Sequence, residues 1–307
     1  MARPTSPVVL GASVSAISAA TPAVSAAPPV SVVAPKTDAK ADARKAEARA
    51  RAPRKGAPLW VHAVRLGILA AILVAMEVAV SGGFVNRIFL ASPTQIWSEL
   101  TYQLSQGTLL ANVAVTMREV FVGYFLAAVI GVGIGVAFVS FPRVEQVFKP
   151  FFSAMMACPK AAIMPLLVVW FGIGFQSKIV LVLLFCTFTI LFNTISGAKQ
   201  AREEHLKVAR VFGASKAQIV FRVLIPSALP SIFTALRIAA AISITGAIFA
   251  EMTAAKAGAG FMLTQAQAVL DTPLIFLVVI VMTVISVCFI GVVDAVERLV
   301  CRNYRRV

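Results

Sequence analysis

Few side chains in this chain of 307 residues could carry chemistry, and their spacing matches no enzyme site. The two histidines, His62 and His205, have neither the HExxH spacing nor the cysteine partners of a zinc site. The four cysteines also lack metal-type spacing. No GxxxxGK[ST] loop is present to cradle the phosphates of ATP. The sequence therefore predicts a protein that is not an enzyme and that holds no metal ion or cofactor.

The segment 199–230 is the one charge-rich stretch between two long apolar runs, which makes it the place to look for function. Its first part, Gln200–Phe212, has apolar residues on one helical face and charged residues on the others. Gly213 follows and interrupts the helical pattern. We therefore expect a first short helix over 200–212.

A second short helix is predicted directly after this glycine. Ser215 and Gln218 have the spacing of a capping box, in which the two side chains satisfy the backbone N–H groups at a helix start. We expect this helix to run over Lys216–Leu224 and to be stopped by Pro226, because the residue before a proline is pushed out of helical geometry. The product is a helix-turn-helix that is too charged to lie in lipid.

Composition places the chain in a membrane. It is 59% hydrophobic and only 13% charged, whereas soluble domains average about 25% charged residues. Its net charge of +15 would suggest a nucleic-acid partner in a soluble protein, but the basic residues lie at the ends and in the polar connections of apolar runs. The charge therefore indicates membrane topology and argues against nucleic acid as a partner.

Six apolar stretches are long enough to cross the bilayer, which requires about 20 residues. The fold predicted is all-α, with six transmembrane helices around the polar hairpin. Ser92-Pro93 should begin a capped surface helix within the outer connection 82–109, and 141–149 should be a short basic connection. The predicted spans are 60–81, 111–139, 150–171, 179–196, 231–250 and 274–293.

The charges of the connections orient these spans. Between residues 36 and 55 there are eight basic and three acidic residues, and between 199 and 222 there are six basic and two acidic residues. Basic connections stay in the cytoplasm, so we expect both termini and the hairpin to be cytoplasmic. The predicted parts are a disordered tail (1–58), the first span with its outer connection (59–90), a transmembrane domain (91–300) that contains the hairpin 199–230, and a second tail (301–307).

Pro159 and Pro165 interrupt the predicted third span. Prolines free backbone carbonyls, which is tolerated where those carbonyls face protein or water. From the residues alone, a kinked helix that lines a translocation path and an ordinary kinked packing helix are equally good interpretations.

Ionisable residues in the apolar runs lie toward the ends of the spans, whereas an ion-coupled transporter usually has them at the bilayer centre. Arg118 and Glu119 fit interfacial or interhelical positions better than catalytic ones. The ionisable residues are Glu77, Arg118, Glu119, Arg237 and Glu251. This distribution favours a transporter driven by a separate subunit over a secondary transporter or channel.

The hairpin resembles a known sequence pattern. Ala209, three further residues, Gly213, nine further residues and then 223–226 (VLIP) are similar to the "EAA" loop of permease subunits in bacterial ABC importers. The following text, IPSALPSIFTALRIA, and the run CPKAAIMPLLVVWFGIGFQSK look most like the nitrate, taurine and alkanesulfonate class. The likeness extends over about 92–298. It departs at Lys207 and Val208, where the pattern usually has glutamate and alanine.

The resemblance implies an ABC importer permease fold in a bacterial inner membrane and a translocation path for a small anionic solute such as a sulfonate, taurine or nitrate. It implies cytoplasmic ABC ATPase subunits, a periplasmic solute-binding protein and a second copy of the chain as partners. The resemblance to this class also favours the interpretation in which the third span is a kinked helix that lines the translocation path. The residues implied in ATPase coupling are Glu204, Lys207, Ala209, Gly213, Ala214, Ser215 and Pro226. Those implied in the path are Pro159, Lys160, Pro165, Trp170, Arg237 and Glu251.

The predicted topology can be tested by thiol labelling. Single cysteines at Ser98 and Ser215 of a cysteine-free variant should lie on opposite sides of the membrane, because the first is in the outer connection and the second is in the basic hairpin. An impermeant thiol reagent added to intact spheroplasts should label position 98 and spare position 215. The reverse pattern would contradict the topology.

Overall fold

The computed structural model describes residues 59–201 and 203–302, and all regular elements in these ranges are helical. The predicted tail 1–58 and the last five residues lie outside the described part of the chain. The α-helices are α2 (Leu59–Ser81), α3 (Pro93–Ser105), α4 (Thr108–Ser140), α5 (Pro142–Ala157), α6 (Met164–Phe171), α7 (Phe175–Lys199), α8 (Glu203–Val211), α9 (Lys216–Ile219), α10 (Ile225–Thr253), α11 (Ala259–Ala268) and α12 (Thr272–Cys301).

Five helical stretches in the described residues are long and apolar enough to cross a bilayer. They are Ala63–Ser81, Thr108–Ser140, Phe175–Lys199, Lys216–Thr253 and Thr272–Cys301. A sixth is present if α5 and the segment 160–171, which are bent by 85° relative to each other, form one span. The predicted all-α membrane fold is therefore confirmed, with its third span in two pieces.

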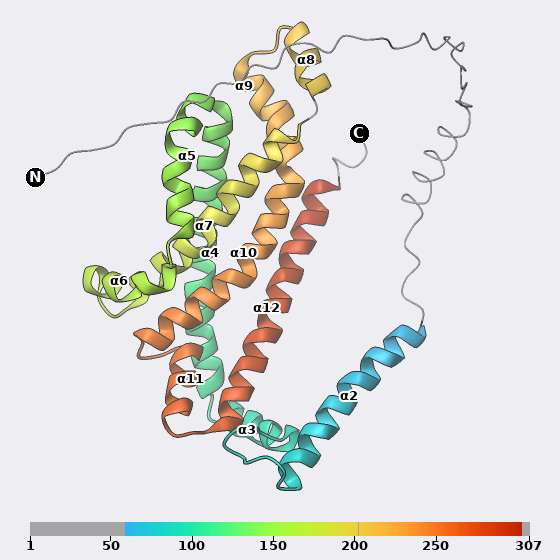
Figure 1. The fold of residues 1–307 in the computed structure, drawn as a ribbon, viewed down its shortest axis with the longest axis vertical. Helices are drawn as coiled ribbons and strands as arrows, with labels where there is room; N and C mark the ends of the chain where they lie inside the picture. Colours follow the sequence, from blue (N-terminus) through green and yellow to red (C-terminus); the bar gives the residue numbers. More distant parts are fainter. Residues whose placement is uncertain (1–58, 202, 303–307) are drawn as a thin grey trace, which may run out of the picture. The chain divides into compact units, whose positions relative to one another are not determined.

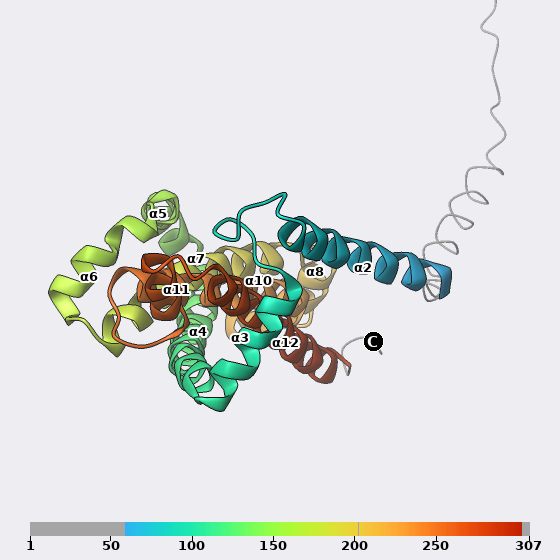
Figure 2. The same ribbon diagram turned by 90° about the horizontal axis from the view of Figure 1, so that it is seen from below.

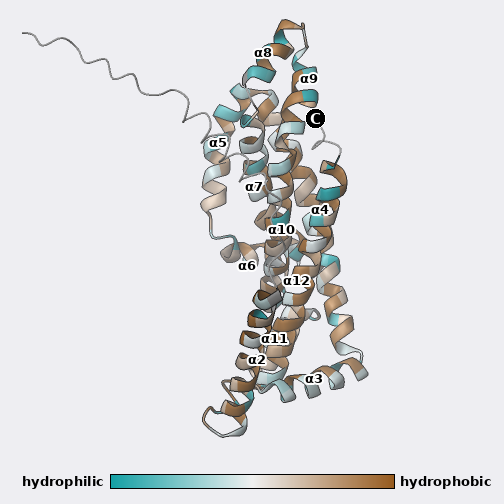
Figure 3. Ribbon diagram, turned by 90° about the vertical axis from the view of Figure 1, so that its right-hand side faces the viewer, coloured by the Kyte–Doolittle hydropathy of each residue, from teal (hydrophilic) through white to brown (hydrophobic). Residues whose placement is uncertain are grey.

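The long helices run between two ends of the bundle (Figure 1). Helices α8 and α9 lie at one end, and α3 and α11 lie at the other. Colouring by hydropathy shows hydrophilic residues on α8 and α9 and mostly hydrophobic residues along α12 (Figure 3). The charged hairpin is thus confined to one end, as its composition requires.

Helix α7 is the centre of the bundle, and α4 approaches it closely through a stripe of small residues. Gly123, Ala127, Gly131 and Gly135 recur every four residues, which places them on one helical face, and all four are buried. A Cβ atom at Gly131 would lie 2.9 Å from the carbonyl oxygen of Thr187, so only a hydrogen fits there. Small residues of this kind let helix backbones meet in a membrane.

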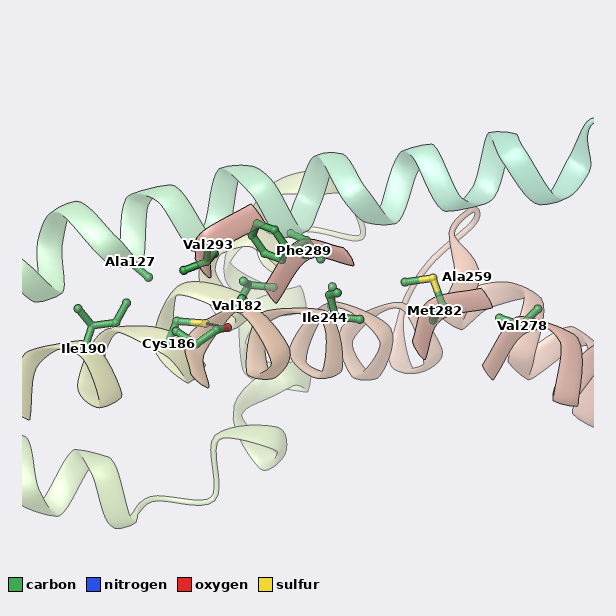
Figure 4. Close-up of a cluster of buried hydrophobic side chains, with 14 of the residues drawn as sticks. Ala127, Val182, Cys186, Ile190, Ile244, Ala259, Val278, Met282, Phe289 and Val293 are labelled. Atoms are coloured by element: carbon green, nitrogen blue, oxygen red, sulfur yellow. Dashed lines mark hydrogen bonds between the residues drawn. The ribbon is translucent and has the colours of Figure 1, made fainter. Parts of the chain in front are cut away.

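Helices α10, α11 and α12 complete the core, and they pack on α4 as well as on one another. The side chain of Cys186 points at the backbone of α10, where its Sγ donates to the carbonyl oxygen of Ala239 at 3.4 Å. Figure 4 shows apolar side chains from α4, α7, α10, α11 and α12 meeting in one cluster. The labelled members are Ala127, Val182, Cys186, Ile190, Ile244, Ala259, Val278, Met282, Phe289 and Val293.

The prediction for residues 141–171 is wrong in its boundaries. Residues 141–149 are not a connection, because Pro142 occupies the first turn of α5, where a missing N–H is harmless. Helix α5 ends at Ala157 because Cys158 precedes Pro159 and is extended, with ψ at 134°. Pro165 lies in the first turn of α6 and begins that helix instead of kinking it. Both views show α6 projecting to one side of the bundle (Figures 1 and 2).

The close packing of α4 on α7 predicts that alanine at two positions only two residues apart will change the stability of the protein differently. Gly131→Ala should lower the stability of the purified protein by about 1–3 kcal/mol, because the new methyl group must push α4 away from α7. Gly133→Ala is the matched control, since a Cβ at that exposed position meets nothing within 4 Å. It should be neutral or stabilise by up to about 1 kcal/mol. Thermal unfolding in detergent measures both, and equal melting temperatures for the two variants would contradict the close packing.

Candidate functional site

The turn of the polar hairpin has the geometry of a glycine helix cap. Gly213 has φ at +71°, a left-handed conformation that favours glycine. Its N–H donates to the carbonyl of Arg210 at 3.0 Å, and the N–H of Ala214 donates to the carbonyl of Ala209 at 3.0 Å. These two bonds form a Schellman motif, which satisfies carbonyls at the end of α8. The predicted break at Gly213 is confirmed, and the turn joins three of the predicted coupling residues, Ala209, Gly213 and Ala214.

The predicted capping box begins α9. The Gln218 N–H donates to Ser215 Oγ at 3.3 Å, and the Ser215 N–H donates to Gln218 Oε1 at 2.8 Å. Ser215 thus satisfies a backbone donor at the helix start, which sets the direction in which the chain leaves the turn. The first helix of the hairpin is shorter than predicted, since α8 begins at Glu203 and Gln200 is the C-cap of α7.

Pro226 does not stop the second helix. A π-helical turn over Val220–Leu224 joins α9 to α10, and the N–H of Ile225 donates five residues back to the carbonyl of Val220. The wider turn places Pro226 at the start of α10, where its missing N–H needs no partner. The hairpin is therefore continuous with a membrane helix through 216–253, which is a correction to the predicted end at Leu224.

Apolar side chains are exposed on the hairpin. Val211 and Phe212 are 84% and 85% exposed, and Phe221 is 68% exposed. Glu204 and Lys207, predicted coupling residues on α8, are also exposed. A charged element that exposes large apolar groups in this way is typical of a protein interaction site.

Four predicted path residues lie between the end of α5 and the end of α6, with Pro165 and Trp170 in α6 itself. Lys160 donates from Nζ to the carbonyl of Met156 at 3.0 Å, and its Nζ lies 5.6 Å from the centroid of the Phe188 ring. Trp170 is 64% exposed. Pro159 and Pro165 are exposed too, so these three residues face away from the bundle core, whereas Met164 and Leu167 of the same segment are buried against α7 and α10.

Arg237 is bound to α12 instead. Its guanidinium pairs with the carboxylates of Asp294 and Glu297. It borders a cavity of about 1240 Å³ that is also lined by His205 and Pro226 near the hairpin. Arg237 therefore joins α10 to α12 at the end of the bundle where α8 lies.

Glu251 follows the predicted end of the fifth span at residue 250, but the helix continues through it to Thr253. Glu251 lies inside α10 and is 1% exposed. Thr116 Oγ1 of α4 donates to Glu251 Oε1 at 2.7 Å and accepts from the N–H of Ala259 at 2.8 Å. Glu251 Oε2 accepts from the N–H of Gly260 at 2.7 Å. The carboxylate thus holds the connection between α10 and α11 against α4.

Glycine at position 258 makes this contact possible. Gly258 has φ at +121°, and a Cβ there would lie 2.1 Å from Glu251 Oε1. Its N–H donates to Asn112 Oδ1 at 2.8 Å. The glycine-rich sequence after α10 is therefore explained by a buried carboxylate that approaches the backbone closely.

A second buried charge lies beside Glu251 and was not among the predicted site residues. Lys178 Nζ of α7 lies 2.7 Å from Glu119 Oε1 of α4, and the two side chains are 6% and 2% exposed. Glu119 Oε2 is buried, and the carboxyl groups of Glu119 and Glu251 also interact with each other. The interhelical interpretation of Glu119 is correct. Its position, the twelfth residue of α4, is farther from a helix end than the sequence predicts.

A pocket of about 350 Å³ opens beside this ion pair. Its walls come from α4, from the start of α7 and from the connection after α10. The lining residues are Val115, Arg118, Glu119, Ile173, Gly174, Phe175, Lys178, Ala255, Lys256 and Ala257. Arg118 lies over the Phe175 ring, with its guanidinium carbon 4.8 Å from the centroid.

The six predicted path residues are therefore not assembled into one site within the chain. Four lie at the bend of α5 and α6, and the other two occupy separate places on α10. Arg237 and Glu251 are 14 residues apart in that helix, which corresponds to about 21 Å along its axis. The sequence signal for the missed pair was an acidic residue and a lysine in two apolar runs, Glu119 and Lys178, but only the packing of α4 on α7 brings them together.

Relatives of the chain are membrane permeases. The family model described as "Binding-protein-dependent transport system inner membrane component" matches residues 128–306. The taurine transport system permease protein TauC of Escherichia coli is 30% identical over 226 residues, which cover 72% of this chain and 82% of the relative. The formylaminopyrimidine transport permease protein ThiX of Halalkalibacterium halodurans is 28% identical and covers 68% of this chain and 84% of its own length.

The fold also has a solved counterpart. The inward-facing MetNI methionine ABC transporter contains a chain that matches with a TM-score of 0.58 at 21% identity, over 64% of this chain and 98% of that one. At this level of identity the match concerns the fold alone.

Proposed function

Because the chain belongs to the family of binding-protein-dependent transport system inner membrane components, we propose that it forms the translocation path of an ATP-driven importer for a small organic anion of the sulfonate type. Family membership makes it the permease subunit of an ABC importer in the inner membrane, and it implies an ATPase and a solute-binding protein as partners. Membership in this family argues against the alternative of a secondary transporter or channel.

The observation that carries the proposal is the exposed hairpin at one end of the bundle. We propose that it docks on a separate ATPase subunit through Val211 and Phe212, with Glu204 and Lys207 beside them and the turn at Gly213 setting the angle between α8 and α9. Lys207 should meet an acidic or neutral surface of that subunit, because like charges at a docked surface lower affinity. The hairpin and both termini are then cytoplasmic.

A second copy of the chain is proposed to complete the path. Helix α6, which follows the bend after α5, exposes Val169 and Trp170 at 78% and 64%. In a dimer these residues, with Pro159, Lys160 and Pro165, would face the same segment of the partner and line the path between two copies.

The sulfonate class is favoured by two observations. TauC, a relative at 30% identity, is named for taurine, which is a sulfonate. Arg118 and Lys256 also line a pocket of the permease with exposed cationic groups. ThiX is named for a different kind of solute, so the substrate must be decided by transport.

Reconstituted transport tests this function. The permease, with its cognate ATPase and binding protein, should import taurine or a short alkanesulfonate into proteoliposomes, and import should require ATP on the ATPase side. Formylaminopyrimidine is the control solute and should not accumulate. Import of formylaminopyrimidine alone, or sulfonate import without ATP, would overturn the proposal.

The docking role of the hairpin predicts different outcomes for two substitutions at one residue. Gly213→Val should weaken recovery of the ATPase with the permease about tenfold, because a left-handed backbone costs a residue with a branched side chain about 1–2 kcal/mol or more. Gly213→Asn should retain association, since asparagine tolerates this conformation. Co-purification normalised to the amount of permease in the membrane measures both. Equal recovery with Val, Asn and Gly would show that the turn does not position the docking surface.

A further inference from the structure

The cavity that Arg237 borders lies between the hairpin, the first half of α10 and the end of α12. Its volume of about 1240 Å³ is enough for a ligand, since small-molecule sites enclose about 300–1,000 Å³. Both views show α12 on the side of the bundle away from α6 (Figures 1 and 2). The cavity is therefore remote from the segment that is proposed to face a second copy of the chain.

The wall of this cavity is basic. It contains four arginines and two carboxylates. Arg237 pairs with both carboxylates, which come from α12. The other three, Arg222, Arg298 and Arg302, are exposed and form no ion pair within the described part of the chain. The wall therefore keeps an excess of positive charge, which a bound anion would balance.

The two arginines at the end of α12 lie on a helical face that is apolar farther along the helix. Positions 280, 284, 287, 291, 294, 298 and 302 follow one another in steps of three or four residues, which places them on one face. Ile280, Val284 and Val287 on this face are all exposed, and α12 is long and apolar enough to span a membrane. The face thus combines an apolar surface with a cationic end, as a phospholipid requires.

The spacing of the arginines suits a phosphate group. Arg298 and Arg302 are one helical turn apart, which brings their Cβ atoms to within about 6 Å of each other. A guanidinium group binds phosphate oxygens through two parallel N–H donors. Arg222, in the π-helical turn, lines the same cavity from the side of the hairpin. The phosphate could therefore be reached from both α12 and the hairpin.

We propose that this cavity binds the phosphate headgroup of an anionic phospholipid from the cytoplasmic leaflet, with the phosphate on Arg298 and Arg302 and the acyl chains along the face of α12 that carries Val287. Basic pockets between membrane helices on the cytoplasmic side recognise lipids of this kind. The inference goes beyond import and rests on the proposed function only for the orientation of the hairpin. With Arg222 also in contact, the bound lipid connects the start of α10 to the end of α12.

Lipid binding to the purified permease tests the site. The full-length chain in mild detergent is titrated with phosphatidylglycerol or with phosphatidylcholine of the same acyl chains, and bound lipid is counted by native mass spectrometry. Phosphatidylglycerol should bind about tenfold more tightly, because its phosphate carries no neighbouring cation that competes with arginine. Glycerol phosphate has the headgroup chemistry without the acyl chains, and a molar excess of it should leave the lipid bound.

Substitutions locate the headgroup. The double variant Arg298→Gln, Arg302→Gln should abolish the preference for phosphatidylglycerol, a loss of about tenfold. Arg143→Gln removes an exposed arginine at the start of α5, outside the cavity lining, and should keep the full preference. Both changes are at exposed side chains, and thermal unfolding of each variant checks that the fold is retained.

Three outcomes would overturn the lipid site. The same loss of preference in Arg143→Gln would show a general attraction to the basic end of the bundle. Displacement by glycerol phosphate would assign the cavity to a soluble phosphate ester, and release of the lipid on addition of the ATPase would assign it to a protein contact. None of these measurements involves transport, so absence of import for every sulfonate tested would refute the proposed function and leave the lipid result unchanged.

Discussion

Close contact between α4 and α7 is the constraint on which the other features depend. Four small residues on α4 allow its backbone to reach α7, and in a membrane such packing takes the place of the hydrophobic effect that drives helix association in water. The same approach brings Glu119 within 2.7 Å of Lys178. If the helices were farther apart, each charge would be buried without its partner, which is costly in an apolar environment.

The buried carboxylates extend this contact to the third helix of the core. Glu251 ties α10 to Thr116 of α4 and to the backbone of the glycine-rich connection. Gly258 is required there because a side chain would collide with the carboxylate. The glycine stripe holds α4 against α7, and Glu251 holds α10 and the connection after it against α4. Together these contacts position the walls of the pocket that opens beside Lys178.

The hairpin is continuous with α10, which links it mechanically to the other end of that helix. The π-helical turn over 220–224 joins the capped start of α9 to a helix that reaches Glu251 at its other end. Movement of a partner docked on the hairpin would therefore act along a single helical stretch on the residues around the pocket. Arg237 lies on this helical stretch, and its ion pairs with Asp294 and Glu297 couple α12 to it.

The sequence by itself determined the class of the protein. Apolar length was enough to predict an all-α membrane protein, and Gly213 and Ser215 were enough to predict the break and the capped helix start within the hairpin. The family was inferred from the resemblance of Ala209, Gly213 and 223–226 to a known pattern. The break and the helix start are local features, because a glycine at a helix end and a capping box depend on neighbours within six residues. Helix boundaries near proline were harder to predict from the sequence. Pro165 and Pro226 begin helices in the structure, and the effect of a proline depends on whether the preceding turn can widen or end.

Only the tertiary structure decided what the ionisable residues do. Glu119 and Lys178 are 59 residues apart in the sequence, and nothing in either apolar run indicates which face meets which neighbour. Glu251 lies one residue past the predicted end of the fifth span, whereas packing buries it against Thr116, 135 residues away. The role of a charge in a membrane protein is set by the partner that the fold brings to it, because an apolar environment leaves an unpaired charge few alternatives.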